Sequence, residues 1–186
     1  MSHMRTTMGT QPNELRRLVA DPDPARAAAE RIAGRRTYLV GIGTSWHAAH
    51  HGAWFLRDAG LDAWALHSAD VAPYARRFDA ADAVIVLSHT GHTGYTAQTL
   101  DRAHEAGAAV VHVTGIGAGG DIETVAPETS YAYTASHTGV LMRLAQIALG
   151  DPHDARARHL HRGGDRLRAR GAGAAAVEHD ERVLAV

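Results

Sequence analysis

The 186-residue sequence contains no cysteine and no lysine, because all 19 of its basic residues are arginine. The absence of cysteine excludes disulfides, thiolate catalysis and cysteine-ligated metals, and the absence of lysine excludes a Schiff base on a lysine side chain. Aromatic residues make up only 5% and the formal net charge is −1, a balance that does not indicate a nucleic-acid-binding surface. No signal peptide is recognisable and no apolar run is long enough to span a bilayer, so we expect a cytoplasmic protein without a membrane partner.

Apolar runs alternate with helical patterns through the middle of the chain. Residues 83–87 form an uninterrupted run of alanine, valine, isoleucine, valine and leucine, which suits a strand buried on both faces. Further strands are predicted at residues 37–43, 63–67, 108–114 and 121–126. Because strands and helices alternate, we predict an α/β fold of the flavodoxin or Rossmann type, a three-layer α-β-α sandwich around a five-stranded parallel sheet.

Composition divides the chain into regions. Residues 1–12 are polar and are expected to be loose. Residues 13–150 are predicted to form one domain, in which an Asp-Pro-Asp-Pro sequence separates two short N-terminal helices. Within it, the glycine-rich segment 115–120 is predicted to be a flexible connection. Residues 151–186 carry seven arginines, four histidines and two glycine-rich breaks, and are predicted to form a partly helical or disordered arm.

Two loops rich in hydroxyls and glycine follow the strands predicted at 37–43 and 83–87. They lie at the carboxyl ends of parallel strands, where an open α/β sheet binds its ligands. A helix follows each loop, and the free N–H groups at a helix start favour an anion. We therefore predict a phosphate-binding site, and we place Ser45 as the N-cap of the first helix. The candidate residues are Gly43, Thr44 and Ser45 in the first loop and Ser88, His89, Thr90, Gly91 and Thr93 in the second.

Together with Ala135-Ser136-His137 at the start of the last predicted helix, the two loops resemble the sugar isomerase (SIS) domain. The resemblance is strongest to the isomerase half of glucosamine-6-phosphate synthase and covers about residues 35–150. It implies a small-molecule sugar phosphate as the ligand and a homodimer as the assembly.

The same resemblance implies roles for individual residues. Three positions match the phosphate-binding hydroxyls of the family: Ser88, Thr90 and Thr93. Three others match contacts to the sugar, to its phosphate or through the backbone: Thr44, Ser45 and Thr134. His89 and His92 stand where glutamine and glutamate are usual, which leaves the identity of the sugar open.

Candidates for acid–base catalysis are fewer, although aldose–ketose isomerisation needs a group that moves a proton between adjacent carbons. The lysine and the first-helix carboxylates of related isomerases are absent. His137 could serve because its charge changes near neutral pH, but its position equally fits a structural histidine at a helix start. Glu128 could face the ligand or be an exposed loop carboxylate, and His92 and Asp70 complete the candidates.

His47, His50, His51 and Trp54 share one face of the helix predicted at residues 46–59. This face is too aromatic for an ordinary solvated surface. One interpretation is an interface with a second subunit or with the C-terminal arm. The other is metal binding, because His47 and His51 lie one helical turn apart, as zinc ligands can. Only the second interpretation involves a cofactor, and that cofactor is zinc.

Three functions are consistent with these features. The first is a phosphosugar isomerase that acts as a homodimer, with the histidine face of one subunit completing the pocket of the other. The second is a non-catalytic binding module, either a sugar-phosphate sensor or one half of an enzyme, which the absent lysine and carboxylates favour. The third is an isomerase or lyase in which histidines hold zinc.

Overall fold

The computed structural model describes residues 2–74, 77–91, 94–130 and 132–150, so the predicted arm at 151–186 lies outside the described residues. Within the described residues, no helix is both long and apolar enough to cross a membrane. The elements follow in the order α1 (His3–Ala20), α2 (Asp23–Ile32), β1 (Arg36–Gly41), α3 (Thr44–Asp58), β2 (Ala63–His67), α4 (Ser68–Tyr74), β3 (Asp82–Leu87), α5 (Gly94–Glu105), β4 (Ala109–Thr114), β5 (Ile122–Glu123) and α6 (Thr134–Leu149).

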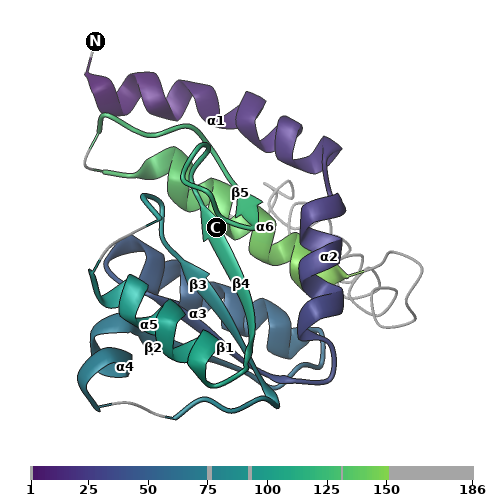
Figure 1. The fold of residues 1–186 in the computed structure, drawn as a ribbon. Helices are drawn as coiled ribbons and strands as arrows, with labels where there is room; N and C mark the ends of the chain where they lie inside the picture. The colour runs from purple at the N-terminus through teal and green to yellow at the C-terminus, as the bar shows by residue number, and fades with distance from the viewer. Residues whose placement is uncertain (1, 75–76, 92–93, 131, 151–186) are drawn as a thin grey trace, which may run out of the picture. The chain divides into compact units, whose positions relative to one another are not determined.

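Two helices, α1 and α2, precede the sheet and are separated at the predicted proline-containing break. Residues 3–12, which we expected to be loose, instead lie within α1. Ser2 caps this helix, because its hydroxyl oxygen accepts a hydrogen bond from the Arg5 backbone N–H at 3.4 Å. α1 runs along α6 (Figure 1), where the buried Arg143 guanidinium donates to the Asp21 carbonyl at 2.5 Å. Residues 3–12 are mostly exposed and extend a helix that is anchored at its other end, at Leu18 and Asp21, so their own polar composition could not indicate it.

Five parallel strands form one sheet, as predicted. The order of the strands in this sheet is β2-β1-β3-β4-β5. Val40 of β1 pairs with Val86 of β3, and Leu87 of β3 pairs with Val113 of β4. From β1 the chain first adds β2 on one side and then crosses to β3 on the other, so the strand order reverses between β1 and β3. Ligands bind at such a reversal in open α/β sheets, outside the carboxyl ends of the strands.

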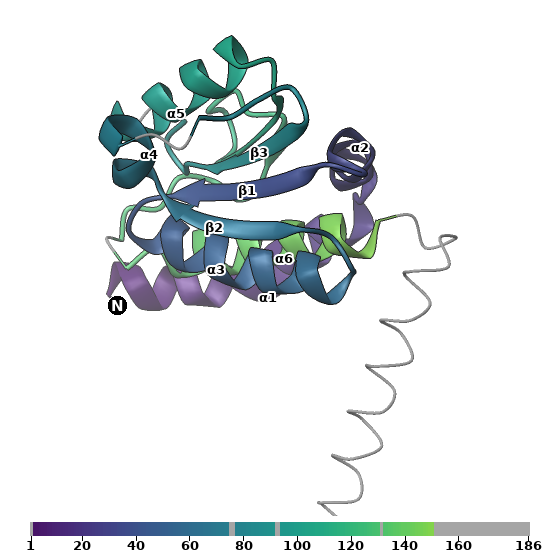
Figure 2. The same ribbon diagram turned by 90° about the horizontal axis from the view of Figure 1, so that it is seen from below.

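Helices cover both faces of the sheet and give the predicted three layers. Figure 2 shows α4 and α5 on one face and α1, α3 and α6 on the other. Tyr38 of β1 belongs to a buried cluster with Val71 of α4 and Ala103 of α5. The next residue, Leu39, points to the opposite face, as alternation along a strand requires. There it contacts α3 at Gly52, where an added Cβ would lie 2.6 Å from the Leu39 Cδ2.

Candidate functional site

The loops after β1 and β3 leave neighbouring strands at the same edge of the sheet. In the first loop Gly43, with a φ of +58°, is the N-cap of α3, and such a φ strains any residue with a side chain. Ser45, which we predicted to be the cap, lies in the first turn of the helix instead, and its N–H donates to the Ile42 carbonyl at 3.2 Å. Its hydroxyl is therefore not used as a cap.

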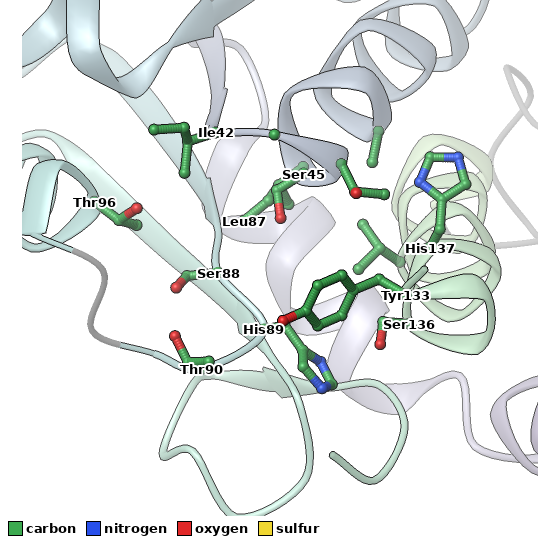
Figure 3. Close-up of a pocket in the computed structure, with 14 residues that line it drawn as sticks. Ile42, Ser45, Leu87, Ser88, His89, Thr90, Thr96, Tyr133, Ser136 and His137 are labelled. Atoms are coloured by element: carbon green, nitrogen blue, oxygen red, sulfur yellow. The ribbon is translucent and has the colours of Figure 1, made fainter. Parts of the chain in front are cut away.

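Both loops open into a pocket of about 320 Å³. Figure 3 shows Ser88, Thr90 and Thr96 on one side of it and the residues at the start of α6 on the other. Seven residues predicted from the sequence line this pocket together: Gly43, Thr44, Ser45, Ser88, His89, Thr90 and His137. The other lining residues are Ile42, Ala48, Leu87, Thr96, Tyr133, Ser136 and Val140. Neither an arginine nor a carboxylate is among the described lining residues.

Two hydroxyls in this pocket are buried without a partner. Ser88 is 4% exposed and Thr96 is 0% exposed, yet neither hydroxyl makes a hydrogen bond with any described residue. A buried polar group left without a hydrogen bond costs about 1–3 kcal/mol, and folded proteins contain few of them. A ligand with acceptor oxygens would supply the missing partners.

The backbone of the second loop is fixed by a close approach to the glycine-rich segment 115–120. Gly91 has a φ of +82°, and a Cβ there would lie 2.7 Å from the Ala118 carbonyl oxygen. Gly115 donates its N–H to the His89 carbonyl at 3.0 Å, and a Cβ on Gly115 would lie 2.7 Å from the His89 Cε1. We predicted a flexible connection here, but this segment packs against the second loop. Gly115 and Gly120 are required by close contacts, and Gly117 and Gly119 by their positive φ, so the glycines of this segment are explained without mobility.

His89 lines the pocket from the second loop, and its ring lies beside Tyr133 (Figure 3). Its ring centroid lies 6.1 Å from that of Tyr133, and neither ring nitrogen has a partner among the described residues. Burial lowers the pKa of His89, while the negative charge of Glu128 acts in the opposite direction. The imidazole is therefore neutral near pH 7 and can donate one hydrogen bond and accept another.

His137 lies in the first turn of α6 and faces the end of the pocket formed by α3. Burial lowers its pKa, the nearby His51 and His47 lower it further, and a backbone hydrogen bond with Thr44 partly opposes these effects. Its Nδ1 has no partner among the described residues. A neutral imidazole with an unpartnered nitrogen can accept a proton from a ligand.

Glu128, which we considered as a catalytic carboxylate, caps α6. Its carboxylate accepts hydrogen bonds from the Thr134 N–H at 3.1 Å and from both the N–H and the hydroxyl of Ser136 at 2.5 Å. The start of a helix leaves several N–H groups free, and an acidic side chain there satisfies them. Glu128 is not among the described residues that line the pocket; the structure shows its carboxylate at the start of α6, and its catalytic role stays a prediction.

Other predicted residues lie apart from the pocket or outside the described residues. Thr134 begins α6 but does not line the pocket, and Asp70 is exposed on α4. His92 and Thr93 lie outside the described residues. Gly91 supports the second loop from behind the pocket.

His47 and His51 are exposed on α3. The Nδ1 of His51 lies 2.8 Å from the backbone oxygen of His47, and the His51 ring centroid is 6.2 Å from that of His137. Among the described residues, no three histidine, aspartate or glutamate side chains are grouped so that they could hold a metal ion. The histidines of α3 thus lie beside the pocket without forming a set of metal ligands in the described part of the chain.

Three polar lining residues were not predicted. Thr96 lies one helical turn after Thr93, a spacing that could have indicated it. Ser136 belongs to the Ala-Ser-His sequence that we assigned to the start of a helix. Tyr133 has a φ of +46° and is the one residue other than glycine with a positive φ among those described. No local pattern indicates that conformation, because it depends on how α6 meets the loop before it.

Comparison with known proteins bears on what this pocket binds. No family model matches the chain. The glutamine–fructose-6-phosphate aminotransferase (isomerizing) of Pyrobaculum aerophilum is 30% identical over an alignment of 151 residues, and the match covers 75% of this chain and 25% of that protein. The chain therefore spans about a quarter of the length of this curated relative.

Several solved structures share the fold. NanR of Vibrio vulnificus, complexed with ManNAc-6P, matches with a TM-score of 0.69 and 17% identity over 90% of this chain and 69% of that one. The C-terminal domain of glucosamine-fructose-6-phosphate aminotransferase from Francisella tularensis matches with a TM-score of 0.65 and 16% identity, over 79% of this chain and 46% of that one. The sugar isomerase domain of the RpiR transcription factor from Sphaerobacter thermophilus matches with a TM-score of 0.61 and 20% identity, over 87% of this chain and 97% of that one.

Proposed function

We propose that this chain, which has the fold of the sugar isomerase (SIS) domain, binds a sugar phosphate in the pocket between the starts of α3, α5 and α6. The buried, unpartnered hydroxyl of Ser88 is the observation that carries this proposal. With Thr90 it can donate to phosphate oxygens, and the positive end of the α5 dipole favours the same anion. Thr44 and Ser45 face the pocket from the neighbouring loop, and Thr93 and His92 remain part of the proposed site.

The proposed reaction is aldose–ketose isomerisation with His137 as the acid–base group. In such a reaction a base takes the proton from the carbon next to the carbonyl and returns it to the former carbonyl carbon, while the hydroxyl proton of the first carbon moves to the carbonyl oxygen. His137 supports this role because its pKa is lowered, so its imidazole is neutral and available as a base near pH 7. It lies on the other side of the pocket from the hydroxyls of Ser88 and Thr90 (Figure 3).

Calorimetric titration with fructose 6-phosphate, followed by an assay for its conversion to an aldose phosphate, tests both parts of the proposal. We expect binding that is lost when the phosphate group is removed, and turnover by the same preparation. Binding without turnover would leave the binding proposal standing and overturn the catalytic one. Equal affinity for fructose and for fructose 6-phosphate would overturn both.

A second function, a sugar-phosphate sensor without catalysis, is favoured by one feature of the pocket. Glu128 is engaged in capping α6, and no carboxylate is among the described lining residues. Two proteins with this fold support it: NanR is complexed with ManNAc-6P, and the RpiR protein is a transcription factor with a sugar isomerase domain. A sensor would bind the sugar phosphate through the same hydroxyls and would not need His137 as a base.

We also propose that the protein acts as a homodimer through the histidine face of α3. This proposal is supported by the exposure of Trp54 on α3 and Trp64 on the edge strand β2, which are 60% and 55% exposed. Exposed aromatic side chains on adjoining elements are typical of an interface. The His51 ring beside His137 would bring the interface close to the pocket.

A further inference from the structure

Thr96 differs from an ordinary buried threonine of a helix. It is the third residue of α5, is 0% exposed and lines the pocket, but its hydroxyl has no partner among the described residues. Thr99, one turn later on the same helix, is also 0% exposed and does not line the pocket. Its hydroxyl donates to the Tyr95 carbonyl at 2.9 Å, the bond that helical threonines usually make. The two residues therefore have equal burial but different hydrogen bonding.

The pocket is the place from which a partner for the Thr96 hydroxyl can come. A fully buried hydroxyl without a hydrogen bond lowers the stability of the fold, so an apolar residue of the same shape would be preferred if packing alone mattered. The hydroxyl lies on the same side of the pocket as those of Ser88 and Thr90 (Figure 3). Ser88 is likewise buried, and its hydroxyl also has no partner in the described part of the chain, so two donors on this side of the pocket lack an acceptor among the described residues.

We propose that the Thr96 hydroxyl is a direct ligand of the phosphate group, together with Ser88 and Thr90, and fixes the direction in which the sugar phosphate lies. This inference rests on the function proposed above. With the phosphate held at the α5 side, the carbon chain extends toward His137 and Tyr133 on the other side. The three donors are neutral, so the phosphate is recognised by hydrogen bonds and by the helix start, without an arginine among the described lining residues.

The test compares Thr96→Val with Thr99→Val, which remove one hydroxyl each from equally buried positions of α5. Calorimetry measures binding of fructose 6-phosphate, and inorganic phosphate is titrated as a competitor. We expect Thr96→Val to weaken both by about tenfold or more, since a hydrogen bond to a charged group is lost. Thr99→Val should leave both affinities unchanged, and Thr96→Ser, which keeps the hydroxyl, should retain most of the affinity.

Thermal unfolding without ligand gives an independent readout. Thr96→Val should match or exceed the wild-type unfolding temperature, because no hydrogen bond is lost, whereas Thr99→Val should lower it. Unchanged affinity in Thr96→Val, with a loss in Ser88→Ala, would overturn the role of Thr96 and leave the proposed function standing. A loss for fructose 6-phosphate without a loss for inorganic phosphate would also overturn it, because the hydroxyl would then contact the sugar. Failure of the wild-type protein to bind either compound would overturn both proposals.

Discussion

At the scale of single residues, the pocket contains hydroxyls that can bind an anion and histidines that can exchange a proton. Its hydroxyls are uncharged at any physiological pH, so they can hold an anion but cannot move a proton. His137 and His89 are the lining residues that titrate near neutrality, and burial lowers the pKa of each. The nearby His51 and His47 add to the lowering at His137. We assign the base to His137 because it lies across the pocket from the hydroxyls of Ser88 and Thr90, whereas His89 belongs to the loop that carries those hydroxyls.

We predict that His137→Gln lowers kcat for fructose 6-phosphate by about 100-fold or more, the usual contribution of a general base. Its Kd should change little, because the phosphate is held on the other side of the pocket. In the wild-type enzyme kcat/KM should rise with pH through a pKa below about 6.5, the ordinary value for histidine, since the base must be neutral. Steady-state rates between about pH 5 and pH 8 measure this.

His104→Gln is the matched control, because His104 is exposed on α5 and does not line the pocket. It should leave both kcat and the pH profile unchanged. A wild-type rate that His137→Gln does not reduce would contradict the assignment of the base.

Residue roles could be predicted from the sequence where a loop and its strand fix them. Four pocket residues come directly after two apolar strands in the sequence, so their place at the edge of the sheet was predictable. They are Thr44, Ser45, Ser88 and Thr90. The position of the Glu128 carboxylate could not be predicted, because whether it caps a helix or faces a ligand depends on the path of the loop before α6.

At the scale of elements, the second loop depends on the segment after β4. Gly115 hydrogen-bonds the His89 backbone and leaves no room for a side chain against the His89 ring. The strands themselves were predicted well, because β-branched apolar runs are a local signal. The contact between the second loop and segment 115–120 was not predicted, because glycine composition alone cannot distinguish close packing from mobility.

We predict that Gly115→Ala destabilises the protein by about 1–3 kcal/mol, the usual cost of overpacking. It should also weaken sugar-phosphate binding, since the added methyl group displaces His89 and the second loop with it. Denaturant unfolding and calorimetric titration measure the two effects.

Gly9→Ala adds the same methyl group in α1, where the Cβ would meet no atom within 4 Å apart from the backbone of its own helix. It should stabilise the protein by about 0.5–1 kcal/mol, because alanine is the better helix former, and should leave binding unchanged. A Gly115→Ala variant with wild-type stability and affinity would show that segment 115–120 does not support the second loop.

At the scale of the whole molecule, the proposed dimer follows from the aromatic residues left exposed on α3 and β2. We predict that sedimentation equilibrium gives twice the mass of the chain. Trp54→Arg should raise the dimer dissociation constant by about tenfold or more, because a charge replaces an aromatic contact at the interface. Val19→Arg is the control: Val19 is 57% exposed on α1, which is not one of the two elements of the proposed interface, and the dimer should persist. A wild-type protein that stays monomeric at all concentrations would contradict the proposal.

The account as a whole depends on the buried hydroxyl of Ser88 binding a phosphate group, and one calorimetric comparison tests it directly. Ser88→Ala and Ser68→Ala each remove a buried hydroxyl that has no partner among the described residues, but only Ser88 lines the pocket. We predict that Ser88→Ala weakens fructose 6-phosphate binding by about tenfold or more, while Ser68→Ala binds as the wild-type protein does. Equal affinities for the two variants would contradict the claim that this pocket holds a sugar phosphate.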